Sequence, residues 1–376
     1  MPAPAAVVNL SPAELSFLRA ALSQDPPLRL DVTKGPRDFR AMRAEYDVLP
    51  SANGSARIAL EDGTEALVGV KAEVEKTLLR PVLGAEDADV GDVDVDADMG
   101  EGDAGDGAGK GQNGWVELSV EIPGFRDDDA LPVFLAAMLG ESLVASGALK
   151  DRLYINRRFH WKLYIDILLL SPPLSYPLAL LSMTTHLALR TTALPALKSE
   201  RDEDPLFDDD WAAATPLYAA SSPSKPPVIV LAIAVGPNII FDPCKEELAV
   251  ADCVLAVACT VDAPAKSPSS KANKDKSAND AHAPAARIVS IRAIDPPSHL
   301  TPPGVANSMN TATGGAAPTD AAHALTQREM LAAGGVWTPP RGGMKRGLVG
   351  AVSRMVVERG GVAEEVIGAL AGIEVG

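Results

Sequence analysis

Residues 152–197 read RLYINRRFHWKLYIDILLLSPPLSYPLALLSMTTHLALRTTALPAL, and this stretch decides the fold. Apolar and polar side chains alternate from Trp161 to Ile167, which predicts a β-strand with one buried face. The strand must stop at Ser171-Pro172-Pro173, because proline cannot donate a hydrogen bond to a neighbouring strand. Asp166 and the prolines also divide the apolar residues into pieces shorter than the roughly 20 that a membrane span needs. The stretch therefore belongs to a buried core.

A helix is predicted directly after this strand. Pro177 suits a first helical turn, where no backbone N–H is needed, and Ser175 is a candidate N-cap. Helical spacing places four side chains on one face, and we expect this narrow stripe to lie on the sheet that contains the strand. The stripe consists of Leu178, Leu181, Thr185 and Ala188.

The composition excludes several classes of protein. The 376 residues carry a net charge of -16, but residues 86–106 alone hold ten acidic side chains and no Lys or Arg, so the total says little about the folded part. The three cysteines form no CxxC pair, which is typical of a reducing compartment. Neither they nor the five scattered histidines have metal-ligand spacing, so no metal site is predicted. The first residues lack a signal-peptide pattern, which favours the cytosol or nucleus.

Further elements follow from local patterns. Ser11-Pro12-Ala13-Glu14 has the pattern of a capping box and starts a short amphipathic helix. Alternation predicts a hairpin over 56–74 that turns at Asp62-Gly63, and a strand over 115–122. The other expected elements are a helix over 130–149, a hairpin over 228–241, a strand from Cys253 to Asp262 after an ambiguous segment, a strand over 286–295, and a C-terminal helix broken at Gly360-Gly361.

Composition also sets the expected organisation. One domain spans residues 10–295, interrupted by an acidic insert (84–114) and a Lys/Ser-rich insert (263–284), both expected to be disordered. A low-complexity loop (296–343) and a C-terminal helical segment (344–372) follow. Asp92, Asp94 and Asp96 have the spacing of a calcium loop. The glycine and glutamate that such a loop needs are absent, so a solvated insert is the better interpretation.

Several segments, in the same order along the chain, resemble the RNase PH-type family of RNA exosome ring subunits. They are LPSANGSARIAL, LVGVKAEV, WKLYIDILLL with its proline-ended helix, and VIVLAIAVGPNIIFDPCKEELAVADCVLAVACTV. The resemblance covers most of residues 10–262 together with 286–295. It implies an α+β RNase PH-like fold (ribosomal protein S5 domain 2-like) of two β-α-β-α halves. It also implies a hexameric ring around an RNA channel, and a place in the nucleus, nucleolus and cytoplasm.

The same resemblance bears on catalysis. Catalytic members of the family degrade RNA by phosphorolysis and hold phosphate on a glycine-rich turn, near two aspartates six residues apart. The equivalent turn here is Ser171–Tyr176, in which prolines replace the glycines whose bare N–H groups would converge on an anion. The carboxylate positions are Glu246 and Asp252, which we interpret as vestigial. An Asp-Gly-Arg common in related subunits reads Asp31-Val32-Thr33 here.

Three functions remain open. The first is a non-catalytic ring subunit that scaffolds 3′-to-5′ RNA processing and degradation and lines the channel, with no cofactor. Its partners would be other RNase PH-type subunits, cap subunits with RNA-binding domains, an associated exoribonuclease and RNA, but no membrane. The second is a phosphate-dependent 3′-to-5′ exoribonuclease acting with a partner subunit. The third is RNA binding without ring assembly. The best basic cluster for RNA contact is Arg152, Arg157, Arg158 and Lys162, although pairing with the acidic loop 200–210 explains it equally well.

Overall fold

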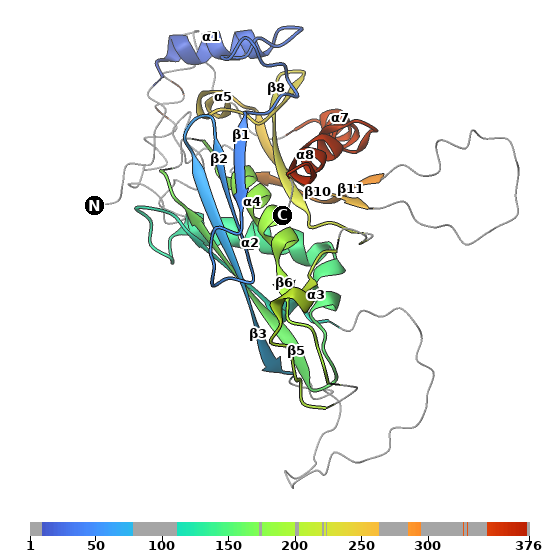
Figure 1. Cartoon of the computed structure of the whole chain (residues 1–376). Helices are drawn as coiled ribbons and strands as arrows, with labels where there is room; N and C mark the ends of the chain where they lie inside the picture. Colours follow the sequence, from blue (N-terminus) through green and yellow to red (C-terminus); the bar gives the residue numbers. More distant parts are fainter. Residues whose placement is uncertain are drawn as a thin grey trace, which may run out of the picture.

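The computed structural model describes residues 10–77, 111–172, 175–199, 203–219, 224–262, 285–294 and 344–373, together with the single residues 222, 326 and 329. A mixed sheet, an antiparallel sheet and two layers of helices alternate in the described part (Figure 1). The main elements are α1 (Pro12–Leu22), β1 (Met42–Tyr46), β2 (Gly54–Leu60), β3 (Glu65–Lys76), β4 (Val116–Glu121), α2 (Ala130–Ala145), α3 (Ala148–Arg152), β5 (Phe159–Leu169), α4 (Leu178–Thr191), β8 (Val228–Val235), β9 (Asn238–Phe241), α5 (Lys245–Ala249), β10 (Cys253–Asp262), β11 (Ala285–Ile294), α7 (Arg346–Val357) and α8 (Val362–Ala371). Short pieces η1 (Asn113–Trp115), β6 (Ala193–Leu194), η2 (Trp211–Ala213) and β7 (Thr215–Pro216) connect them.

The first sheet contains the predicted central strand. Its order is β1-β2-β3-β5-β4, and the alternating apolar residues of β5 from Trp161 to Leu169 are all buried. The hairpin of β2 and β3 turns at Gly63, whose φ of +83 suits glycine because a side chain at this angle would be strained. The predicted strand and hairpin are therefore confirmed.

Strand β5 has different neighbours on its two sides. β3 pairs with it antiparallel, with Lys76 opposite Phe159, whereas β4 pairs with it parallel, with Val116 opposite Leu163. The end of β3 and the start of β4 therefore lie at the same end of β5. The segment between them holds the acidic insert, of which residues 84–110 lie outside the described residues. Gly111 to Gly114, which we assigned to that insert, are described: the Gly111 N–H lies 3.1 Å from Asp151.

Helix α4 packs between the two sheets, against β2 and β3 on one side and β8 on the other (Figure 1). Every residue from Leu178 to Leu189 is buried. The predicted narrow apolar stripe was wrong, because the helix has sheet on both sides. Two of its polar residues are satisfied within the helix: the Thr184 and Thr185 hydroxyls donate to carbonyls one turn back, each at 2.8 Å. Ser175 does not cap the helix; the cap position is Pro177, and no side chain bonds there.

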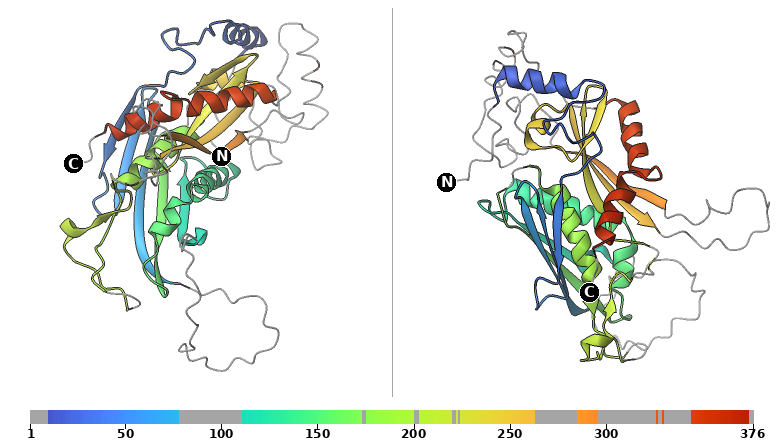
Figure 2. Two further views of the ribbon diagram at one scale, coloured as in Figure 1. Left: turned by 90° about the vertical axis from the view of Figure 1, so that its right-hand side faces the viewer. Right: turned by 45° about the horizontal axis from the view of Figure 1, so that its top comes forward.

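The second sheet has the order β11-β10-β8-β9, and all eight residues of β8 are buried. Helix α4 covers one face, and α8 contacts β8 and β10 while α7 packs on β11 (Figure 2). Burial of both faces explains why β8 reads as a continuous apolar run. The α4 and α8 layers are joined where the Arg190 guanidinium donates to the Leu370 carbonyl at 2.6 Å. The expected break at Gly360-Gly361 separates α7 from α8, where Gly360 has a φ of +68.

Helix α1 begins with the predicted capping box: the Ser11 side chain accepts from the Glu14 N–H, and the Glu14 carboxylate accepts from the Ser11 N–H. Its buried leucines pack on β8, β9 and the end of α5 rather than on the main core. One strand was missed. No strand was predicted between the first helix and residue 56, yet β1 forms at the edge of the first sheet. The ambiguous segment before Cys253 contains the short helix α5, and strand β10 begins at Cys253 as expected.

Candidate functional site

An arginine lies beside the turn where the resemblance places phosphate binding. The Arg40 guanidinium donates to both oxygens of Asp242 at 2.7–3.2 Å, to Asp62 at 2.6 Å and to the Ser175 hydroxyl at 2.9 Å. Ser175 belongs to the turn between β5 and α4; Pro173 and Leu174 of the same turn lie outside the described residues. The cationic group next to this turn is thus held by two carboxylates of the chain itself.

The environment keeps Arg40 charged and paired. Burial by itself would lower the pKa of Arg40, but hydrogen bonding and the charges of Asp242 and Asp62 outweigh it and raise the pKa. Asp242 is nearly buried and has a φ of 45, an uncommon conformation that aspartate tolerates better than most residues. Its carboxylate also accepts from the Arg40 backbone N–H at 2.7 Å, so side chain and backbone hold the same anion.

The two predicted carboxylates have separate surroundings. Asp252 accepts from Arg19 of α1 at 2.7 Å and from the Gly236 N–H at 2.9 Å. Glu246, in the first turn of α5, lines a groove beside α1 instead. Because α5 ends at Ala249, the six-residue spacing spans a helix end and a turn, and no contact between the two carboxylates is present in the described structure. Neither was found to meet Arg40.

The strongest buried ion pair was not foreseen from the sequence. The Arg29 guanidinium donates to both oxygens of Glu247 at 2.9 and 3.0 Å, and the two side chains are only 5% and 1% exposed. Arg29 also donates to the carbonyls of Gly35, Asp38 and Asp242 at 2.9–3.2 Å. The pair fastens the segment after α1 to α5. The sequence shows Arg29 and the adjacent acidic residues Glu246 and Glu247, but no local pattern indicates that side chains 218 positions apart form an ion pair.

Each residue of the predicted basic cluster interacts with another part of the chain. Arg152 is half-buried: it donates to the Leu217 carbonyl at 2.9 Å, and its guanidinium lies 4.3 Å from the Tyr218 ring centre. Arg158 pairs with Asp204 at 2.9 Å, which is the acidic-loop contact weighed above. Lys162 pairs with Glu117 at 3.2 Å and donates to the Gly114 carbonyl at 3.0 Å. Arg157 also makes an interaction within the chain.

Other chemistries find little support in the part of the chain that is described. No group of three or more His, Cys, Asp or Glu side chains could hold a metal ion there. Burial raises the pKa of the Cys244 and Cys259 thiols to about 12, so both stay protonated at neutral pH. None of the described helices combines the length and the apolar character that crossing a membrane requires.

Comparison with known proteins identifies the fold. A model described as the 3′ exoribonuclease family, domain 1, matches residues 38–195. The "Exosome complex component RRP42" of Saccharomyces cerevisiae (strain ATCC 204508 / S288c) is 29% identical over 250 residues, which cover 65% of this chain and 79% of the yeast protein. The "Exosome complex component rrp42" of Schizosaccharomyces pombe (strain 972 / ATCC 24843) is 29% identical over 265 residues, covering 66% and 78%.

Solved structures were compared as well. The structure titled "Archaeal exosome core" is 20% identical with a TM-score of 0.45, covering 74% of this chain and 84% of its own. A second, titled "archaeoglobus fulgidus exosome with RNA bound to the active site", is 19% identical with a TM-score of 0.45, covering 74% and 86%. The family match and the two yeast relatives together show that this chain carries an RNase PH-type domain and is similar to RRP42 along about two thirds of its length.

Proposed function

We propose that this chain is a non-catalytic subunit of an RNA exosome core ring that supports 3′-to-5′ RNA processing and degradation. The RNase PH-type domain and the similarity to two exosome components support the assembly. The observation that carries the non-catalytic part is the Arg40 site. Its guanidinium is already bonded to Asp242, Asp62 and Ser175, so a phosphate ion would have to displace a buried internal carboxylate.

The proposal extends to partners and place. The partners are other RNase PH-type subunits in a six-membered ring, cap subunits with RNA-binding domains, an associated exoribonuclease and RNA. The sites of action are the nucleus, nucleolus and cytoplasm. Residues 10–295 form the ring domain, with residues 344–372 as a helical addition, and the role does not require a cofactor.

A phosphate-dependent exoribonuclease has less support. It would need Glu246 and Asp252 to act on one phosphate. Asp252 instead accepts from Arg19, and Glu246 lies against apolar side chains of α1. We therefore keep both as vestigial carboxylates.

Assembly is tested by purifying tagged full-length chain from its own cells and quantifying stoichiometric partners by mass spectrometry. We expect near-equimolar recovery of five further RNase PH-type chains or their duplicates. Recovery of the chain alone, as a stable monomer, would contradict the ring.

Catalysis is tested on the same purified complex with single-stranded RNA and inorganic phosphate, measuring nucleoside diphosphates. We expect that substitutions in this chain do not change any release of nucleoside diphosphates by the complex. Asp252→Asn is the informative variant, and Arg19→Gln is its matched control, because both break the same ion pair. Release that is lost in Asp252→Asn but retained in Arg19→Gln would establish Asp252 as part of an active site and refute the proposal.

RNA contact by Arg152, Arg157, Arg158 and Lys162 is a separate part of the proposal. Arg157→Glu with Arg158→Glu in the assembled complex should weaken RNA retention and lower its salt dependence by about 0.7 per lost phosphate contact. Asp204→Asn removes the acidic partner of Arg158 and serves as the control. Unchanged retention in the double variant would mean that these arginines have only the structural role that the ion pair indicates.

A further inference from the structure

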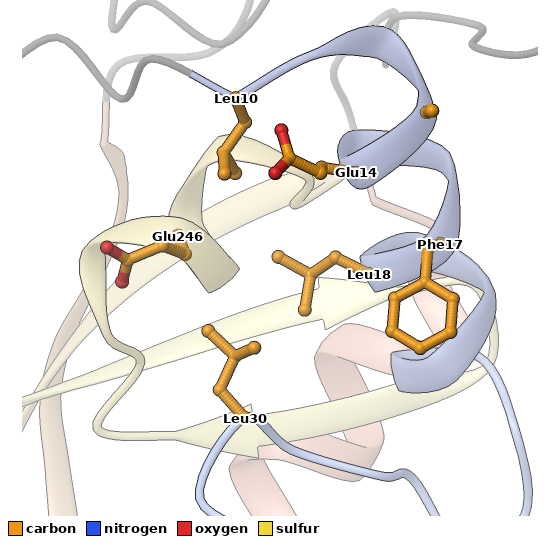
Figure 3. A pocket seen from close by; sticks show the side chains of 7 residues that line it. Leu10, Glu14, Phe17, Leu18, Leu30 and Glu246 are labelled. Atoms are coloured by element: carbon orange, nitrogen blue, oxygen red, sulfur yellow. The ribbon is translucent and has the colours of Figure 1, made fainter.

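A groove runs between α1, the segment that follows it, and α5 (Figure 3). Its volume is about 400 Å³. The leucine side chains point into it from three directions, Glu14 lies beside Leu10, and the Glu246 carboxylate points away from the leucines at the rim (Figure 3). The lining consists of Leu10, Ala13, Glu14, Phe17, Leu18, Leu30 and Glu246, which we call the α1–α5 groove.

The groove lies in the most apolar exposed region of the described chain. Of the ten large hydrophobic side chains that are exposed there, four occur within residues 17–32. Phe17 is 71% and Leu30 is 53% exposed, and Leu28 and Val32 flank Leu30 in the sequence with 46% and 74%. Contiguous exposed apolar surface of this kind marks interaction sites, because water contact with it is unfavourable.

The buried Arg29–Glu247 ion pair fixes the segment that carries Leu28 and Leu30. Arg29 lies between Leu28 and Leu30 and points inward to its buried pair with Glu247, so its two neighbours face solvent. The same pair places Glu246, the residue before Glu247, on the groove side.

The wall formed by α1 is fixed as well. Leu15, Leu18 and Leu22 pack against the second sheet. Arg19 bonds to Asp252 and to the Val250 carbonyl. A partner would therefore meet a preformed surface and would lose little free energy in ordering it.

The charge of the groove selects the partner. Among the described residues, Glu14 and Glu246 are the charged members of the lining, which contains no Lys or Arg. Bonds from the Ser11 backbone and hydroxyl lower the pKa of Glu14, so it is ionised at neutral pH. Within the described residues, Asp252 and Glu247 nearby have arginine partners, whereas Glu14 and Glu246 form no ion pair. A positive group on the ligand would meet the negative charge of Glu246 at the rim of an apolar pocket, with the charge of Glu14 nearby.

We propose that the α1–α5 groove binds a segment of another protein chain that presents a large apolar side chain next to a Lys or Arg. The apolar side chain enters between Leu18 and Leu30 and packs on Phe17. The basic group meets Glu246. If the proposed function holds, the donor is another subunit of the same complex, but the chemistry of the groove requires only the stated segment.

The test uses site-specific photo-crosslinking in the full-length chain, expressed in its own cells. In one variant a benzophenone side chain replaces Phe17. In a second, control variant it replaces Val133 of α2, which is 53% exposed, as Leu30 is. We expect a single heterologous protein to crosslink from position 17 but not from position 133, through a peptide with an apolar residue next to Lys or Arg. Crosslinks to this chain's own residues 1–9, to a second copy of this chain, or to no protein would overturn the proposal.

Variants supply an independent measurement on the crosslinked partner. Leu30→Asp and Glu246→Lys should each reduce its co-purification about tenfold or more, as expected for central interface residues. Val133→Asp should leave its yield unchanged. Thermal unfolding of each variant must match that of the unmodified chain, since all three positions are outside the core. Unchanged co-purification in both groove variants would refute the docking role.

The proposed function and the groove can fail separately. A crosslinked partner of the stated chemistry, in preparations that lack RNase PH-type subunits, would support the groove and refute ring membership. An intact ring with no protein crosslinked at position 17 would support ring membership and refute the docking role of the groove.

Discussion

Removing one member of the Arg29–Glu247 pair should be far more damaging than removing both. Glu247→Leu leaves a guanidinium that is only 5% exposed with carbonyl partners alone. An uncompensated buried charge of this kind costs about 3–5 kcal/mol of unfolding free energy. Arg29→Met leaves the Glu247 carboxylate with the Cys244 N–H as its remaining hydrogen bond and should cost a similar amount.

The double variant distinguishes pairing from simple packing. Independent effects would add to about 6–10 kcal/mol, but removing both charges also removes the need to compensate either of them. We therefore expect the double variant to be about 3 kcal/mol less destabilised than the sum. The three carbonyls that lose the Arg29 donors keep it from reaching the stability of the unmodified chain.

The assay is urea unfolding followed by the fluorescence of the four tryptophans. The control is Asp128→Asn, which breaks an ion pair whose side chains are 81% and 71% exposed and should not move the midpoint. Single variants that each cost less than about 1 kcal/mol, or a double variant that equals the sum, would refute the buried-pair reasoning.

Three further predictions concern the core around α4 and the thiols. Burial lowers the pKa of His186 from 6.5 to about 3, so the native state binds fewer protons than the unfolded state between these values. The contribution of neutral His186 to the free energy of unfolding is complete above pH 6.5 and is lost as pH falls toward 3, by up to about 1.4 kcal/mol per pH unit. His186→Met should reduce this dependence of the unfolding free energy on pH, and an unchanged dependence in the variant would contradict the assignment. Ser182→Ala removes the hydroxyl that accepts the Ile229 N–H at 2.8 Å and should cost about 1–3 kcal/mol in urea unfolding, whereas a neutral result would mean that the bond does not form. The buried thiols of Cys253 and Cys259, and the half-buried thiol of Cys244, all have raised pKa values, so they should resist Ellman's reagent at pH 8 in the native chain and react fully in denaturant. A fast reaction of the native chain would contradict this prediction.

Local patterns were enough to place most elements. The capping box at Ser11, the turn at Gly63 and the alternation along β5 each act within a few residues, and the folded chain preserves them. Strand β1 escaped prediction because it is short and lies at a sheet edge. Charged side chains such as Arg43 are tolerated there and interrupt the apolar pattern.

Helix α4 shows where periodicity fails. Counting an apolar stripe assumes that polar residues face water, but the hydroxyl and imidazole groups of α4 find internal partners. Thr184 and Thr185 bond to their own helix, and His186 bonds to the Pro226 carbonyl at 2.8 Å. A helix with satisfied polar groups can be buried on all sides, and sequence spacing does not reveal this.

The candidate site was predicted in part. Loss of glycine from the turn at Ser171 was visible in the sequence, because proline's chemistry is local. The network around Arg40 was not, since its partners Asp62 and Asp242 are brought together only by the fold. Spacing along the chain did not indicate the surroundings of Glu246 and Asp252, because a helix ends between them and the two side chains have different neighbours.

The two strands that flank β5 also determine how freely this chain can vary in length. Two strand separations of about 4.8 Å, together with the offset of about 13 Å along β5 between Phe159 and Leu163, place the exit of β3 and the entry of β4 roughly 16 Å apart, a gap that a handful of extended residues can bridge. The length of the connection therefore has little effect on the fold, because the entropic cost of closing a loop grows only slowly with the number of its residues. A reporter or affinity handle can be grafted there, or the connection trimmed to a short Gly/Ser bridge, with the sheets left in register.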